Sequence, residues 1–253
     1  MIRQIFSKKS LGHKNGFHLR GHEVKRIETF SDGVFAFAVT LLIVSLEVPK
    51  SFEELLITMR GFFAFGICFA LLLFIWHEQH VFFRRYGMED ITTIVLNSVL
   101  MFIVLFYVYP LKFLFTLLFS DSIYGVGNSP FSIKQVQVPS LMIIYGVGFI
   151  SIYAIFLLLY LHAYRNKILL QLTALELFDT RTAIYSQVIL ISVGVLSVTC
   201  SFLLPLEQQG WSGLVYGLIG VALTIFHRLR ARMRKKVYEH VEDESAYTKQ
   251  HDF

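Results

Sequence analysis

The residues of this sequence with the most chemical potential stand at the ends of long apolar stretches. Ser31 and Asp32 directly precede an uncharged stretch that runs from Gly33 to Leu46, and Arg26 lies shortly before them. A carboxylate, a hydroxyl and a guanidinium this close together could hold an ion or form a polar network. Because a carboxylate at the edge of an apolar region is costly unless it is paired, we expect Asp32 to serve structure or gating rather than ion coordination.

Other chemically capable groups in the sequence have simpler explanations. His77 and His80 have the spacing of neighbours on a helix, but no further metal ligand is close in sequence, so we expect a polar cluster and no metal site. The alternating arginines from Arg228 to Arg234 are spaced by two rather than three and follow the last apolar stretch, which favours an anchor near anionic lipid over a voltage sensor. No G-x-S-x-G, Walker or H-E-x-x-H pattern occurs, so the sequence predicts neither an enzyme nor a cofactor.

The composition indicates a membrane protein. Hydrophobic residues make up 55% of the 253 residues and charged residues only 16%, whereas a soluble domain of this size needs more charge on its surface. The apolar residues form long blocks, and about 20 apolar residues in a helix cross the hydrocarbon core of a bilayer. Because a helix satisfies its own backbone groups, we expect an all-α polytopic fold.

The apolar blocks predict six transmembrane helices. They cover residues 33–46, 61–76, 91–111, 138–161, 182–206 and 210–226. The expected organisation is an N-terminal segment over 1–25, a transmembrane domain over 26–227 and a charged tail over 228–253. Residues 165–181 are too polar to span a bilayer, and their leucines recur at helical spacing, so we expect an extension of the fourth helix.

The charge distribution predicts the orientation in the membrane. An even number of spans places both termini on one side, and the loops on that side carry the basic excess, at Arg84, Arg85, Arg165, Lys167 and Arg181. Such an excess is typical of the cytoplasmic side of a membrane, so both termini are expected there, with membrane lipids as partners. The net charge of +5 does not indicate nucleic-acid binding, because no aromatic and basic module accompanies it.

The first apolar block is short for a lipid-exposed helix. It has only 14 uncharged residues, from 33 to 46, and ionisable residues flank it at both ends. Such a helix is easier to place inside the protein, where its ends meet water or polar partners. Its residues at helical spacing form one face, made of Gly33, Phe37, Leu41, Val44 and Val48, with Thr40 beside it. From the residues alone, this face could line a polar path or serve ordinary helix packing.

The start of this helix resembles a known family. The run from Arg26 to Gly33 fits the pattern R-x-x-x-F-S-D, in which Phe30, Ser31 and Asp32 hold the last three positions. This pattern is similar to the signature of the endosomal and lysosomal potassium channel family called transmembrane protein 175. Residues at the end of the second block and in the first turns of the third also resemble that family, namely Trp76, His77 and Asn97.

The resemblance implies a function. In that family the first helices surround the pore, single six-span units form tetramers, and no carbonyl-lined filter loop is used. The resemblance places an apolar constriction at Phe37, Leu41 and Val44 and a selectivity hydroxyl at Thr40. The family usually has Ile or Leu where this chain has Phe37, which changes the expected width of the closed pore. The implied function is a homotetrameric channel that favours potassium ions.

Several alternatives stay open at this stage. A secondary transporter of a cation or small solute is the second hypothesis, and a membrane scaffold without transport activity is the third. Glu47 could concentrate cations at the outer mouth or be a solvated helix end. Asp32 could cap the first helix, or it could join a network that holds this helix to the second and third. The residues expected in that network are Arg26, Ser31, Asp32, Trp76, His77 and Asn97.

Overall fold

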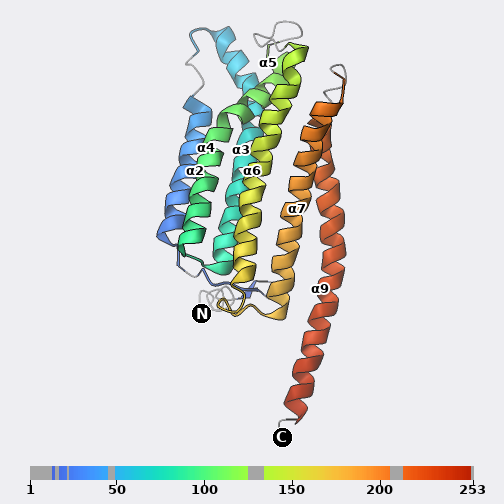
Figure 1. Ribbon diagram of the computed structural model, residues 1–253. Helices are drawn as coiled ribbons and strands as arrows, with labels where there is room; N and C mark the ends of the chain where they lie inside the picture. Colours follow the sequence, from blue (N-terminus) through green and yellow to red (C-terminus); the bar gives the residue numbers. More distant parts are fainter. Residues whose placement is uncertain are drawn as a thin grey trace.

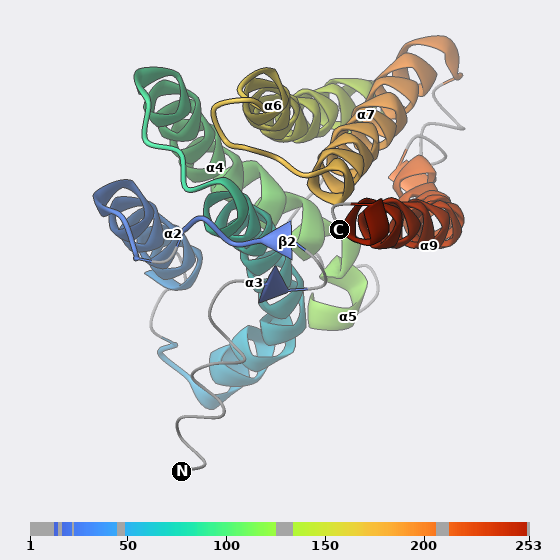
Figure 2. The same ribbon diagram turned by 90° about the horizontal axis from the view of Figure 1, so that it is seen from below.

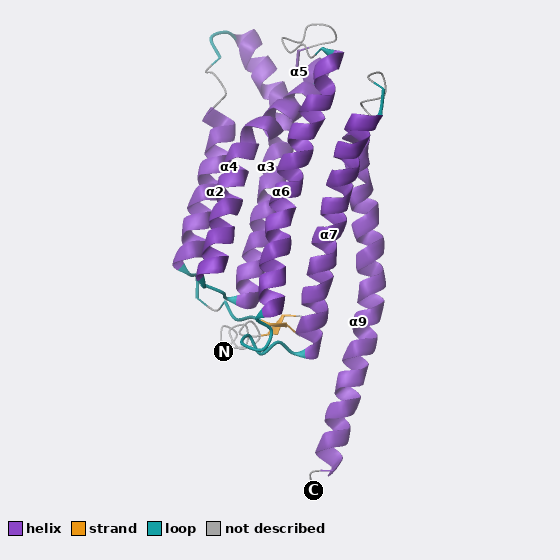
Figure 3. Cartoon of the chain, viewed as in Figure 1, coloured by secondary structure: helices purple, strands orange, loops and turns teal. Residues whose placement is uncertain are grey.

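Helix makes up nearly all of the described chain (Figure 3). A computed structural model describes residues 13–14, 17–21, 23–44, 49–124, 134–205 and 213–251. Six long helices run along a common direction (Figure 1): α2 (Arg26–Val44), α3 (Phe52–Tyr86), α4 (Ile91–Leu118), α6 (Val138–Arg165), α7 (Ala174–Leu203) and α9 (Leu218–His251). The short elements are β1 (His13–Lys14), β2 (Phe17–His18), α5 (Ser120–Tyr124) and the 3-10 helices η1 (Gln135–Gln137) and η3 (Val215–Gly217). The prediction of an all-α fold with six long helices is confirmed.

Four of these helices, α3, α4, α6 and α7, are long and apolar enough to cross a membrane, within the residues that the structure describes. Helix α2 carries Arg26, Glu28 and Asp32 in its first two turns, which leaves only its remainder apolar. Helix α9 is apolar at its start and highly charged over its C-terminal part. Its last turns extend beyond the other helices (Figure 1), at the end of the bundle where β1 and β2 lie.

Capping residues set the ends of α3, which is longer than the apolar block that predicts it. Ser51 is the N-cap, and its hydroxyl accepts a hydrogen bond of 3.1 Å from the backbone N–H of Glu54. At the other end, Gly87 has a φ of 58°, the left-handed conformation that ends many helices. The helix therefore continues through charged turns at both ends of its apolar centre.

The segment 165–181 differs from the prediction. Helix α6 ends at Arg165, and α7 already begins at Ala174. Thr173 forms a capping box with Glu176: its hydroxyl accepts from the Glu176 N–H, and the Glu176 carboxylate accepts from the Thr173 N–H. The expected extension of the fourth helix is wrong, because the leucine spacing across this segment does not show the turn and the cap that divide it.

The packing order of the helices places α2 and α9 on opposite sides of the subunit (Figure 2). Helix α2 lies against α3 and α4, and α9 lies against α7. The core between α3, α4 and α6 contains fully buried apolar side chains such as Cys68, Leu100 and Phe156. Because α2 has neighbours on one side only, one of its faces is left open by its own subunit.

Candidate functional site

One face of α2 is buried within the subunit. Ser31, Phe35, Ala38 and Leu42 have 5% or less of their surface exposed. These positions are spaced by four, three and four residues, so they lie along one stripe of the helix. The stripe contacts α3 and α4 and fixes which way α2 is turned.

The opposite face of α2 is not covered by its own subunit and carries two of the predicted pore residues, Phe37 and Thr40. Phe30, Gly33, Phe37 and Thr40 all lie on it, with Phe30 64% and Phe37 56% exposed. Leu41 is half-buried at the edge of this face and packs partly against the core. We call the stripe of Phe30, Gly33, Phe37 and Thr40 the open face of α2.

Two predicted pore positions remain, Val44 and Glu47. Val44 is the last residue of the helix, one turn beyond Thr40. The Thr40 hydroxyl donates a 2.9 Å hydrogen bond to the carbonyl of Ala36, so its oxygen keeps lone pairs that can face the open side. Glu47 lies outside the described residues.

A chain of polar side chains ties the middle of the subunit to α2. The Asn97 side-chain amide donates to the Ser31 hydroxyl at 2.8 Å, and the Gln79 amide donates to the Asn97 side-chain carbonyl at 2.9 Å. Ser31 in turn donates to the backbone carbonyl of Ile27 at 2.8 Å. All three side chains are buried, so each bond satisfies a group that would otherwise be costly to bury. The chain joins α2, α3 and α4.

Asp32 has a separate partner. The Trp76 indole N–H donates a 2.7 Å hydrogen bond to the Asp32 carboxylate, and the Trp76 ring stacks on His80 with 5.5 Å between centroids. Asp32 lies in the second turn of α2 rather than at its N-cap, because the helix begins at Arg26. The contact therefore links α2 to α3 and does not cap a helix.

The structure brings four of the six residues of the predicted network into hydrogen bonds. Arg26 and His77 do not join it: both are exposed and make no hydrogen bond or ion pair within the described residues. Gln79, which the sequence did not single out, takes their place. The sequence feature that could have indicated Gln79 is its position three residues after Trp76, which places both residues on nearly the same side of α3.

Replacing Asn97 with leucine is expected to destabilise the protein. The change leaves the Gln79 amide without its acceptor and the Ser31 hydroxyl without its donor, and a buried polar group without a partner costs about 1–3 kcal/mol. The loss of stability is measurable as a lower midpoint of thermal unfolding. Ser98→Ala is the control, because the exposed Ser98 hydroxyl bonds only to the Ile94 carbonyl in its own helix. Equal midpoints for the two variants would show that the network contributes no stability.

A lysine holds the other end of α2. The Lys112 ammonium on α4 donates a 3.0 Å hydrogen bond to the backbone carbonyl of Leu42, in the last turn of α2. A cation is favourable there, because the last carbonyls of a helix carry partial negative charge. Polar contacts therefore hold α2 near both ends, while the side chains of its open face make no hydrogen bond to another helix within the described residues.

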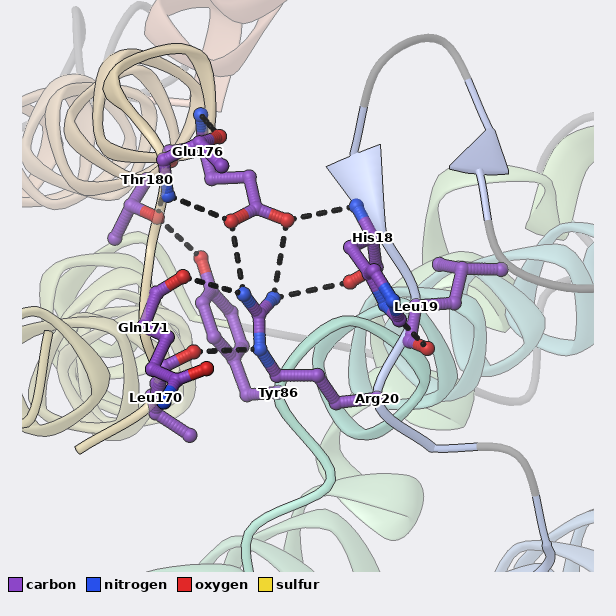
Figure 4. A network of polar contacts seen from close by, with 9 residues as sticks. His18, Leu19, Arg20, Tyr86, Leu170, Gln171, Glu176 and Thr180 are labelled. Atoms are coloured by element: carbon purple, nitrogen blue, oxygen red, sulfur yellow. Dashed lines mark hydrogen bonds and ion pairs between the residues drawn. The ribbon is translucent and has the colours of Figure 1, made fainter. Parts of the chain in front are cut away.

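The segment before α2 is fixed by a buried carboxylate (Figure 4). Glu176 is fully buried and accepts hydrogen bonds from the Arg20 guanidinium at 2.8 and 3.1 Å, from the His18 N–H at 2.7 Å and from the Thr173 N–H at 2.9 Å. The carboxylate is thus satisfied by charge and by backbone donors.

Arg20 joins three parts of the fold. Besides Glu176, its guanidinium donates to the carbonyls of Leu170 at 2.8 Å and Gln171 at 3.2 Å, in the turn between α6 and α7 (Figure 4). The next residue, Gly21, donates its N–H to the Arg84 carbonyl of α3 at 3.1 Å. The start of α2 is therefore positioned by α3 and α7 as well as by its own packing.

Comparisons with known proteins identify relatives of this chain. A model of the family described as endosomal/lysosomal potassium channel TMEM175 matches residues 26–107. A protein of Marivirga tractuosa called a potassium channel is 36% identical over 247 residues, which cover 94% of this chain and all of that protein. A potassium channel of Chamaesiphon minutus is 34% identical over 96 residues, 35% of this chain and 47% of its own length.

Two solved structures share the fold. A crystal structure of a threonine-to-alanine variant of the potassium channel MtTMEM175, bound to a nanobody fusion, has a TM-score of 0.77 and 37% identity over 87% of this chain and 99% of that one. The structure of a lysosomal potassium-selective channel TMEM175 homolog from Chamaesiphon minutus has a TM-score of 0.53 and 22% identity over 81% of this chain and 96% of that one, and shows the fold alone. The resemblance seen at Arg26–Gly33 is thus confirmed, and the chain belongs to the TMEM175 family.

Proposed function

We propose that this chain is one subunit of a homotetrameric cation channel that favours potassium, with the open face of α2 around the central pore. The observation that carries the proposal is the division of α2 into a face packed in its own subunit and an open face with Phe37 and Thr40. The relative from Marivirga tractuosa and the solved MtTMEM175 structure are both named potassium channels, which supports the same function.

The constriction acts through its apolar side chains. Four copies of Phe37, Leu41 and Val44 around an axis form a narrow apolar passage, which expels water and sets a dehydration barrier for a cation. Thr40 offers hydroxyl oxygens between these levels, where they can replace part of the hydration shell of a potassium ion. Glu47 then raises the local concentration of cations at the outer mouth.

The polar contacts of α2 set how it can move in this proposal. The bonds of Ser31 and Asp32 at its inner end and of Lys112 at its outer end keep it against α3 and α4. Opening of the pore then requires α2 to rotate or tilt between these contacts, and this movement withdraws the Phe37 ring from the pore axis. Asp32 and Ser31 serve this positioning and do not bind the ion.

The proposed location is a bacterial inner membrane with both termini on the cytoplasmic side. The long apolar helices make the chain a membrane protein. Strands β1 and β2 and the C-terminal end of α9 lie at the same end of the bundle (Figure 1), as an even number of spans requires. The basic residues Arg84, Arg85, Arg165 and Lys167 lie in or beside the turns at that end, which favours a cytoplasmic position.

Purified protein in a planar bilayer under a potassium and sodium gradient tests this function. The expected result is discrete current steps that reverse near the potassium equilibrium potential. Silent bilayers with slow, saturable flux into vesicles would instead show a secondary transporter. Absence of both current and flux would favour a scaffold without transport activity.

A further inference from the structure

A group of cations gathers around one tyrosine at the end of the bundle where β1 and β2 lie. The Arg181 guanidinium on α7 donates to the Tyr164 hydroxyl through Nη2 at 2.7 Å and Nε at 3.2 Å. The Lys167 ammonium, in the turn after α6, lies 5.4 Å from the centroid of the same ring. Arg181 and Lys167 are exposed, so both charges are accessible from outside the subunit.

The nearest acids on α7 are already neutralised by other groups. Asp179 accepts two hydrogen bonds from Arg234 of α9, at 2.8 and 3.0 Å. Glu176 is occupied by Arg20. Within the described residues, neither Arg181 nor Lys167 has an acidic partner. The cluster therefore has an excess of positive charge.

A third cation adds to this excess. The Arg230 guanidinium of α9 stacks on the Phe178 ring at 3.9 Å and donates to the Thr182 hydroxyl, both of which are neutral groups. Burial and, in smaller part, the positive charge of Arg181 lower the pKa of Arg230. The Asp179 carboxylate acts on Arg230 in the opposite direction, but this carboxylate is already paired with Arg234. Arg230 and Arg181 together therefore keep a positive charge that attracts an anion.

An exposed apolar stripe of α7 begins at the cluster. Tyr185, Val188 and Val195 stand four, seven and fourteen residues after Arg181, so they lie on the same face of the helix, and each is more than 40% exposed. With a rise of about 1.5 Å per residue, the stripe from Arg181 to Val195 is roughly 20 Å long. That length is enough for an acyl chain, which covers half of the hydrocarbon core of about 30 Å.

We propose that Lys167, Arg181 and Arg230 bind the phosphate of an anionic lipid, whose acyl chain lies along the exposed stripe of α7. The geometry favours a lipid over a soluble phosphate because the charges and the apolar stripe are continuous. The site lies on the side of the subunit away from α2 (Figure 2), where a bilayer would surround the assembly.

The side chains are arranged to hold a phosphate. Tyr164 fixes the Arg181 guanidinium through two of its nitrogens, and Nη1 makes no hydrogen bond within the described residues. A guanidinium held in this way loses little entropy when it binds a phosphate oxygen. Lys167 adds a mobile charge that can follow the headgroup, and each such cation near a membrane surface strengthens binding of anionic lipid about fivefold.

Native mass spectrometry of the full-length protein, titrated with dioleoylphosphatidylglycerol, tests the site. The wild type is expected to bind this lipid more tightly than dioleoylphosphatidylcholine. The double change Lys167→Gln and Arg181→Gln is expected to weaken binding of phosphatidylglycerol by roughly 25-fold. Tyr164→Phe, which keeps the ring but releases Arg181, is expected to produce a smaller loss in the same direction.

The control is Arg60→Gln, which removes the same charge from an exposed position in the first turns of α3, at the other end of the bundle from the cluster. The affinity of this variant should stay close to that of the wild type. Equal losses of affinity for Arg60→Gln and for Arg181→Gln would reduce the effect to overall charge and overturn the site. Inorganic phosphate at millimolar concentration should not displace bound phosphatidylglycerol. If it displaces this lipid as effectively as added phosphatidylglycerol does, the assignment of the site to a lipid is overturned. Neither result depends on whether the protein conducts ions.

Discussion

Alanine in place of Phe37 is expected to raise the resting potassium current by on the order of tenfold, which corresponds to about 1.4 kcal/mol off the barrier. Phe37 is more than half exposed on the open face of α2, so the change removes a large ring from the proposed axis and few contacts from the subunit core. A wider and less apolar constriction admits water, and a hydrated cation then meets a lower barrier. Single-channel recordings at zero applied stimulus measure the effect.

Phe202→Ala is the matched control for this prediction. Phe202 is 70% exposed on α7, away from α2, so its removal should leave the current unchanged. Leu41→Ala should also increase the leak, although Leu41 packs partly against the core and its loss also costs stability. A Phe37→Ala channel with wild-type current would remove this side chain from the constriction.

Glutamine in place of Glu176 is expected to have the largest effect on stability. The substitution keeps the size of the side chain but removes the charge that neutralises Arg20, in a site where the carboxylate is fully buried. Removing one partner of a buried ion pair costs about 3–5 kcal/mol. For a protein of this size, such a loss lowers the thermal midpoint by roughly 6–20 °C.

Glu89→Gln tests whether this effect comes from burial. Glu89 forms an ion pair of 2.9 Å with Lys25, but its side chain is 51% exposed. Exposed pairs contribute about 0–1 kcal/mol, so the midpoint should change by only a few degrees. Similar shifts in Glu89→Gln and Glu176→Gln would contradict the role assigned to the buried pair. Both can be measured by tryptophan fluorescence during heating in detergent.

The helices could be predicted from the sequence because hydrophobic blocks are a local signal. The ends of the helices were less accessible, since caps such as Ser51 and Thr173 decide them. The turn between α6 and α7 shows the difficulty. Its leucines keep a helical spacing, and only the Thr173-x-x-Glu176 pattern indicates where a new helix starts.

The residues of the candidate site could be predicted from the sequence where a polar residue stands in an apolar stretch. Asp32 and Asn97 stand out because polar groups in apolar stretches need partners, and both have them. Gln79 and the pair of Arg20 with Glu176 were missed because their partners lie in segments that are distant along the chain. Contacts between residues 156 positions apart leave no periodic signal in a single sequence.

Cysteine accessibility on α2 tests the central claim most directly. In channels recorded in a planar bilayer, with Cys200 replaced by serine, Thr40→Cys places a thiol on the open face, whereas Ala38→Cys places one on the face buried within the subunit. A small cationic thiol reagent should block the current of the Thr40→Cys channel and leave that of the Ala38→Cys channel unchanged. Conducting Thr40→Cys channels that stay unmodified and unblocked would show that ions do not pass along this face of α2.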